Sequence, residues 1–150
     1  MQKARYSIVI NAPKERVWHT MLDDATYRQW TNAFHEGSYY QGSWEQGSKI
    51  LFLGPDENGK ADGGMIGRIA ENRPYEFVSI EMLGMIENGV EDTTSEAVKK
   101  WTPAHENYTF TEKDGATEVV VDIDVADEYQ AMFDEMWPRS LKVLKELAEK

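Results

Sequence analysis

The chain has 150 residues and contains no cysteine. Without thiols it can form no disulfide, no cysteine-ligated zinc site or iron–sulfur cluster, and no thiol nucleophile. Glycine and proline are also few, at 11 and 5 residues. Because 41% of the residues are hydrophobic and 29% are charged, the composition is typical of a globular protein rather than of a disordered or collagen-like chain. We expect a single domain spanning residues 1–150.

Positive charge is scarce, since 16 Lys and Arg face 27 Asp and Glu and give a formal net charge of −11. Such a chain repels phosphate backbones and anionic headgroups, so neither nucleic acid nor a membrane surface is an expected partner. No apolar run approaches the ~20 residues that cross a bilayer, and the opening MQKARYSIVINAPKERVW lacks the apolar region of a signal peptide. These absences, with the lack of cysteine, predict a soluble cytoplasmic protein without membrane insertion.

Motifs for metals and cofactors are missing as well. His19, His35 and His105 are far apart and match no metal-ligand spacing. The glycines of residues 63–67, GGMIG, are not followed by the helix that a dinucleotide fingerprint requires. The acidic run Glu87–Glu96 has looser spacing than a calcium loop. We therefore expect neither a metal nor a cofactor.

The pattern of apolar residues predicts first a strand, then two short helices. Tyr6, Ile8 and Ile10 alternate with Ser7 and Val9, which is typical of a strand over 4–10. Asn11 is a plausible N-cap for a helix whose apolar face carries Val17, Trp18, Met21 and Leu22, and residues 26–32 predict a second helix. Turn residues then separate six predicted strands, at 39–44, 48–53, 64–70, 75–83, 105–111 and 117–125.

The remaining segments are a long polar excursion at 84–103 and a C-terminal helix at about 127–148. The excursion is either a lid over a binding site or a solvated loop. Apolar residues recur along the helix at spacings of one, three and four. Pro138 lies inside this helix and predicts a kink, either a bend that follows a curved sheet or a hinge.

This order of elements predicts an α+β fold, in which a curved antiparallel sheet of about six to seven strands wraps around the long C-terminal helix, with two short helices after the first strand. The C-terminal helix is the only predicted element long enough to cover the sheet, at roughly 33 Å. Since a curved sheet cannot close tightly along such a helix, we expect an apolar cavity between them.

The sequence also resembles a known family. The opening INAPKERVWHTML is similar to the first strand and helix of the SRPBCC, or START-like, domains, and Trp30 matches the tryptophan of the second short helix. Gly42, Ser43, Trp44 and Gly47 in GSWEQGSKILFL match the family's Gly-Ser-Trp-x-x-Gly turn. The stretch WTPAHENYTFTEKDGATEVVVDIDV resembles its final hairpin. The similarity is greatest to the branch named for the activator of the Hsp90 ATPase, the AHSA type.

The resemblance implies a helix-grip fold with a hydrophobic ligand cavity. The leading hypothesis is therefore binding of a small hydrophobic, aromatic or lipid-like molecule between the sheet and the C-terminal helix, without catalysis. The alternative is a purely structural role, in which the large apolar side chains fill the core. The candidate ligand-binding residues are Phe52, Met65, Phe77, Met82, Met85, Trp101, Tyr108, Phe110, Met132, Met136 and Trp137.

Two other functions remain open. A cyclase or hydrolase of the polyketide-cyclase kind needs a polar group in the cavity, for which Glu106, Tyr108 and Arg68 are the nominees. If the face with Tyr108 and Phe110 points inward, Glu106 is a buried carboxylate with a raised pKa; otherwise it lies at a wet strand end. The third hypothesis is a co-chaperone. Chaperone binding in that family also relies on an N-terminal domain for which this chain has no room, so it is the last choice.

Overall fold

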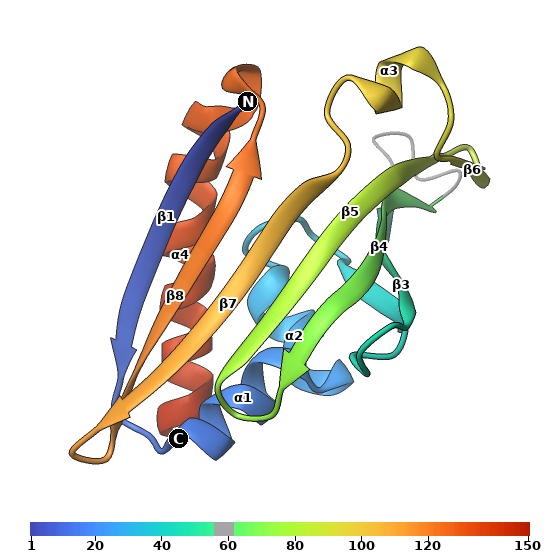
Figure 1. Ribbon diagram of the computed structural model, residues 1–150. Helices are drawn as coiled ribbons and strands as arrows, with labels where there is room; N and C mark the ends of the chain where they lie inside the picture. Colours follow the sequence, from blue (N-terminus) through green and yellow to red (C-terminus); the bar gives the residue numbers. More distant parts are fainter. Residues whose placement is uncertain (56–61) are drawn as a thin grey trace.

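The fold is a curved antiparallel sheet with helices against one face (Figure 1). The computed structural model describes residues 1–55 and 62–150, so the middle of the predicted turn at 54–63 lies outside the described residues. The strand order is β1-β8-β7-β5-β4-β3-β2, and β6 pairs with β5. This arrangement confirms the predicted α+β helix-grip fold. The strands are β1 (Gln2–Ile10), β2 (Tyr39–Gly42), β3 (Lys49–Pro55), β4 (Asp62–Arg73), β5 (Phe77–Glu87), β6 (Val90–Asp92), β7 (Ala104–Lys113) and β8 (Ala116–Val125).

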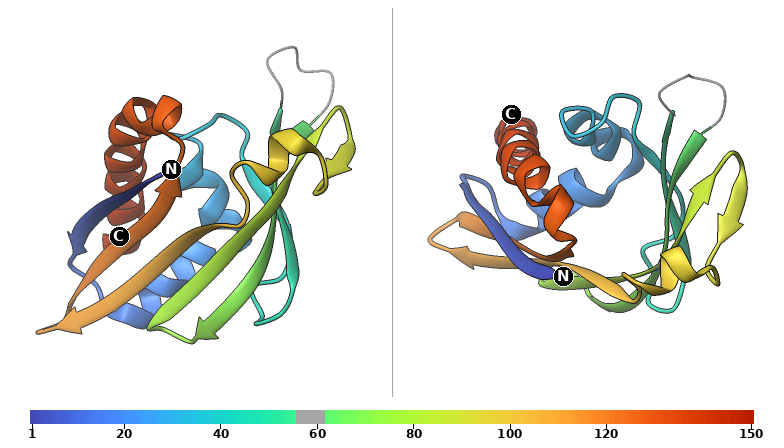
Figure 2. Two further views of the ribbon diagram at one scale, coloured as in Figure 1. Left: turned by 45° about the horizontal axis from the view of Figure 1, so that its top comes forward. Right: turned by 90° about the horizontal axis from the view of Figure 1, so that it is seen from above.

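Three helices share the cover of the sheet: α1 (Lys14–Leu22), α2 (Asp24–Thr31) and α4 (Gln130–Glu149), the last preceded by a 3-10 turn, Asp127–Tyr129. The C-terminal helix, expected to cover the sheet, shares this role with α1 and α2. α4 packs along β1, while α1 lies against β7 and β8, and α2 against β2 and α4. Figure 2 shows the three helices on one side of the curved sheet. The two short helices extend the cover because the sheet is too wide for one helix.

The end of β1 is tied to the end of α4. The Asn11 backbone N–H donates to Glu149 Oε2 at 2.8 Å, and Lys145 Nζ donates to the Val9 carbonyl at 2.9 Å. Asn11 is therefore not the N-cap of α1, as the sequence had suggested; Pro13 takes that position. α4 continues through Pro138, which faces solvent. In the described residues, no helix has both the length and the apolar character needed to cross a bilayer.

The polar excursion at 84–103 is largely regular structure. β5 continues to Glu87, and Asn88 and Gly89 both have positive φ, at 53° and 77°. This is the backbone of a tight hairpin turn, which pairs β6 with β5. A short helix follows, α3 (Glu96–Lys99), and the Ser95 hydroxyl accepts a hydrogen bond from the Val98 N–H at 3.2 Å. Local turn and capping chemistry therefore orders this segment.

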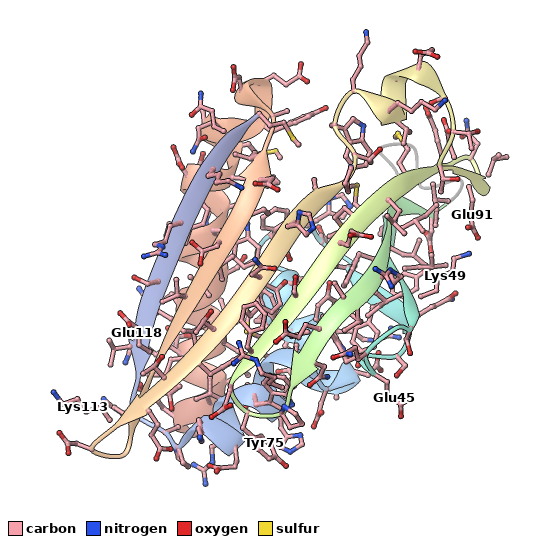
Figure 3. All side chains as sticks on the ribbon, in the orientation of Figure 1. Glu45, Lys49, Tyr75, Glu91, Lys113 and Glu118 are labelled. Carbon is pink, nitrogen blue, oxygen red and sulfur yellow. The ribbon has the colours of Figure 1, made fainter. Side chains whose placement is uncertain are left out.

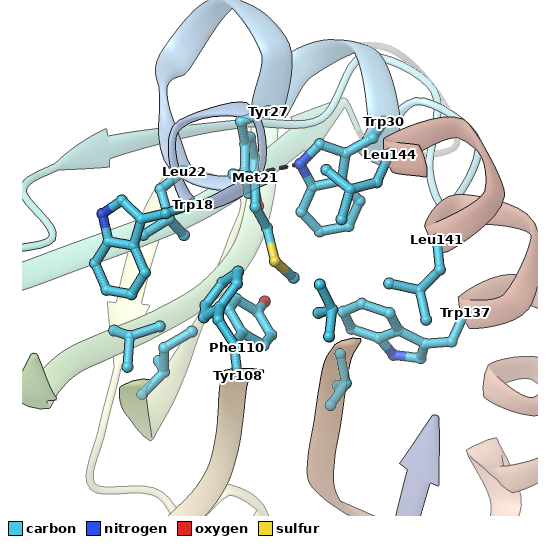
Figure 4. Packing of buried hydrophobic residues seen from close by; sticks show 14 of the residues in the cluster. Trp18, Met21, Leu22, Tyr27, Trp30, Tyr108, Phe110, Trp137, Leu141 and Leu144 are labelled. Atoms are coloured by element: carbon cyan, nitrogen blue, oxygen red, sulfur yellow. Dashed lines mark hydrogen bonds between the residues drawn. The ribbon is translucent and has the colours of Figure 1, made fainter. Parts of the chain in front are cut away.

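The core forms where α1 and α2 meet the sheet and α4 (Figure 4). Trp30 of α2 is 2% exposed, and its indole N–H donates to the Met21 carbonyl of α1 at 2.9 Å. The Trp30 ring also lies 6.0 Å from the Trp137 ring of α4. One side chain thus joins the three helices.

Replacing Trp30 by alanine should lower the free energy of unfolding by about 3–5 kcal/mol, because it removes a buried ring and leaves a cavity between the helices. Urea unfolding followed by circular dichroism measures the change. The matched control is Tyr129→Ala, since Tyr129 is 52% exposed and its loss should cost within about 0.5 kcal/mol. Equal effects of the two substitutions would contradict the role given to Trp30.

Candidate functional site

The sheet face turned toward the helices, here called the inner face, has a sealed half and an open half. Near α1 its side chains are fully buried, as Ile50, Ile69, Val78 and Ile80 show at 0% exposure. Toward α3 and β6 the inward side chains keep contact with water. These half-buried residues are Tyr40, Phe52, Met65, Met85 and Glu106.

Glu106 is the one carboxylate among these inward residues of the described strands. It shares a face of β7 with Tyr108 and Phe110, which are 2% and 4% exposed, and it pairs across the sheet with Ile80 and Ile123. The strand alternation had predicted this inward direction on condition that the aromatic face is buried. The Tyr108 hydroxyl donates to Glu106 Oε2. Glu106 therefore lies on the inner face, not at a frayed strand end.

Burial raises the pKa of Glu106 from 4.5 to about 7, and the hydrogen bond from Tyr108 offsets part of that rise. No positive charge contributes to the shift. Burial also raises the pKa of Tyr108 and of Tyr27 on α2, and the negative charge of Glu106 adds to both shifts. The carboxylate and the two phenols thus form one electrostatically coupled group.

Other aromatic rings pack against the two tyrosines of this group. The Tyr27 ring centroid lies 4.9 Å from that of Tyr40 and 6.5 Å from that of Phe52. On the α4 side, the Trp137 ring lies 6.2 Å from the Tyr108 ring. Figure 4 shows Tyr27, Tyr108 and Trp137 converging from α2, β7 and α4. The Trp137 indole nitrogen is buried and has no hydrogen-bond partner among the described residues.

Most of the predicted binding residues share this interior. Those on the inner face of strands or against the core are Phe52, Met65, Met82, Met85, Trp101, Tyr108, Phe110 and Trp137, and Met136 is half-buried on α4. Phe110 lies at the sealed end, where its ring is 5.1 Å from that of Trp18. None of these placements tests ligand binding, which stays a prediction.

Three predicted site residues lie elsewhere. Phe77 is out of phase with the buried Val78 and Ile80, so it points to the outer face, where the Arg73 guanidinium lies 4.9 Å from its ring. Met132 is 41% exposed on the solvent side of α4. Arg68 also points outward, and its Nη2 lies 3.5 Å from Glu81 Oε1. Arg68 is therefore removed from the catalytic nominees.

The site also contains residues that were not among the candidates. Tyr27 falls within the helix predicted for 26–32, where Trp30 matches the family's tryptophan, and Tyr40 and Trp44 fall within the strand predicted for 39–44. The spacing of Tyr27 and Trp30 gave a usable signal, since a helix face with two large aromatics must be buried. Tyr40 lies on a four-residue strand too short for alternation to show its direction.

The hollows that the described part of the chain has on the outer face of the sheet include the following two. The larger, about 350 Å³, is lined by Gly47, Lys49, Ile66, Gly67, Arg68, Leu83, Glu91 and Thr93. Lys49 and Glu91 form an ion pair of 2.7 Å at its rim (Figure 3). The other, about 70 Å³, is lined by β1, β7 and β8 near Lys3 and Asp124. Neither is the predicted cavity between sheet and helix, which stays a prediction. The described residues hold no group of three metal-ligating side chains.

Comparison with known proteins identifies the family. The model of the family described as "Activator of Hsp90 ATPase homolog 1-like protein" matches residues 11–149. The chain therefore belongs to this family, which confirms the resemblance seen in the sequence. The comparison with curated proteins gave no match.

Several solved structures share the fold. One is the Aha1 dimer from Colwellia psychrerythraea, with 16% identity and a TM-score of 0.71 over 99% of this chain and 97% of that chain. Another is the AHSA1-like protein from Aeromonas hydrophila, with 17% identity and a TM-score of 0.68 over 97% and 92%. A third is DynU16, a protein of the dynemicin biosynthetic locus, with 14% identity and a TM-score of 0.69 over 100% of this chain and 48% of that chain.

Replacing Glu106 by glutamine should remove a pH dependence of stability. Because the pKa of Glu106 is about 7 in the folded chain and about 4.5 when exposed, the folded state keeps a proton that the unfolded state loses between these values. The free energy of unfolding of the wild type should therefore fall as pH rises from about 4.5 to about 7. The fall should exceed that of Glu106→Gln by at most about 3 kcal/mol.

Urea unfolding at a series of pH values measures this difference. The control is Glu118→Gln, because Glu118 is an exposed residue of β8 (Figure 3) and should leave the pH profile unchanged. If the free energy of unfolding changes with pH in the same way for the wild type and Glu106→Gln, then folding does not keep a proton on Glu106.

Proposed function

We propose that the chain binds a small, mainly apolar or aromatic molecule against the open half of the inner face, between β3, β4, β5 and β7 on one side and α2 and α4 on the other. The observation that carries this proposal is the half-exposure of large inward side chains, Phe52 and Met65 among them. Covering such surface gains ~25 cal/mol per Å². A molecule that displaces water there would bury the apolar side chains that the fold leaves half-exposed.

Polar groups at the same place would orient the guest. Glu106 offers a carboxyl group, and the Trp137 indole N–H is a buried donor without a partner in the described residues. A few convergent polar groups within a mainly apolar lining are the usual composition of a small-molecule site.

A substitution that fills the open half should block binding. In Met65→Trp a larger side chain would occupy the space against Phe52, its partner across β3 and β4. Affinity for an apolar fluorescent probe such as anilinonaphthalene sulfonate, and for aromatic compounds that displace it, should fall at least tenfold with little change in melting temperature. Methyl NMR of Met65, Met82 and Met85 locates the bound probe.

The control is Val9→Trp, which adds the same ring to the outer side of β1, where Val9 is 54% exposed. It should bind as the wild type does. The proposal fails if a broad panel of aromatic and lipid-like compounds leaves the methionine methyl resonances unchanged, or if the two tryptophan variants bind alike.

Glu106 also supports a second candidate function, acid–base catalysis on a bound molecule. A carboxyl group with a pKa of about 7 can both donate and accept a proton near neutral pH, and Tyr108 contacts it directly. A cyclase or hydrolase of this kind should show a pH–rate inflection near pH 7 that Glu106→Gln abolishes. Turnover that survives this substitution would leave binding as the function.

The family description motivates a third candidate, a chaperone partner. A pull-down with purified Hsp90, together with an assay of its ATPase rate, tests it directly. If the chain neither binds Hsp90 nor changes its ATPase rate, this candidate is removed. The proposed small-molecule site is unaffected by that result.

A further inference from the structure

We infer that the inner face selects an organic cation, a primary or substituted amine attached to an aromatic or aliphatic body. This inference rests on the proposed function, because it names the class of molecule that the same site would take. It follows from a carboxylate without a counter-ion, the rings around it, and the absence of competing positive charge on the described inner face.

Among the described inward residues of the sheet, Glu106 is the one that can carry a full negative charge. None of the ion pairs between described residues includes it. Tyr108 is its one hydrogen-bond donor among those residues and contacts Oε2 only. The other oxygen is left for water or a ligand. A partly desolvated carboxylate without a counter-ion gains more free energy from binding a cation than from binding a neutral group.

The groups that face Glu106 from the packed elements are neutral. Tyr108 lies on its own strand and Tyr27 on α2, and both keep their protons because burial raises each phenol pKa. The neighbouring strands present Ile80 and Ile123. No described Lys or Arg lies within ion-pair distance, so a ligand ammonium would meet attraction from the carboxylate and no repulsion from a nearby cation.

The rings would contribute a second attraction. Cations bind to the faces of tryptophan and tyrosine within about 6 Å of the ring centroid. Tyr27, Tyr40 and Trp44 form one group, with the Tyr40 and Trp44 centroids 5.5 Å apart. Tyr40 and Trp44 are half-buried, so part of each remains available to a guest. The net charge of −11 also raises the local concentration of cations over anions.

The competing possibility is a neutral guest whose carbonyl accepts a hydrogen bond from protonated Glu106. The two guests respond oppositely to pH. An amine that stays protonated binds the carboxylate, so its affinity rises as pH increases through the pKa of Glu106, about 7. A neutral acceptor binds the acid, so its affinity falls over the same range.

The test compares naphthylmethylammonium with its neutral isostere naphthylmethanol, by calorimetry at about pH 6 and about pH 8. The amine should bind at least tenfold more tightly than the alcohol at the higher pH, and should lose most of this advantage at the lower pH. In Glu106→Gln, amine and alcohol should bind alike at both pH values. Glu118→Gln controls for attraction by the acidic surface and should behave as the wild type.

The outcomes separate the two proposals. If neither compound perturbs the methyl resonances of Met65 and Met85, the proposed small-molecule site itself fails. If both perturb them but the alcohol binds as tightly as the amine, or Glu106→Gln keeps the preference for the amine, the site stands and its selection of cations is wrong. Amine binding that Glu118→Gln weakens as much as Glu106→Gln is surface attraction and also overturns the inference.

Discussion

One constraint organises this molecule: a carboxylate is held on the covered face of a sheet, among aromatic rings, without a positive charge to neutralise it. Taking Glu106 partly out of water costs free energy that the Tyr108 hydrogen bond only partly offsets. The fold can bear that cost because the other half of the same face is closed by residues such as Ile69 and Ile80, which are 0% exposed. Burying an ionisable group without a structural partner is typical of functional sites.

The arrangement of the helices explains why the inner face is sealed at one end and open at the other. α4 is fixed along β1 by hydrogen bonds at both of its ends, since the Tyr6 hydroxyl donates to Asp134 at 2.7 Å and Asn11 donates to Glu149. α1 closes the sheet where β7 ends and β8 begins, and α2 links to α4 through Trp30 and Trp137. No described helix packs squarely over the upper parts of β4 and β5. The elements that frame this face are thus held by direct contacts and hydrogen bonds between β1, α1, α2 and α4.

The sequence predicted much of the fold and part of the candidate site, and the wrong predictions have physical causes. Strand alternation correctly directed Glu106 inward with Tyr108, because β7 is regular and its aromatic face must be buried. Phe77 was chosen for its size without applying this rule, which places it in phase with Ser79 and Glu81 rather than with Val78. Periodicity could not show that Tyr40 points inward, because its strand is very short. It also could not show that β6 pairs with β5. The sharing of the cover among three helices depends on sheet width and curvature, which arise only when all strands are assembled.

The most direct test of this account is an NMR titration of the Glu106 side-chain carboxyl carbon in the ligand-free protein. The titration midpoint should lie near 7, because burial raises the pKa of this group and no cation lowers it. Added naphthylmethylammonium should then move the midpoint downward, since a bound cation favours the ionised form. A midpoint near 4.5, the value of an exposed glutamate, would contradict the conclusion that this carboxylate is held partly out of water without a counter-ion.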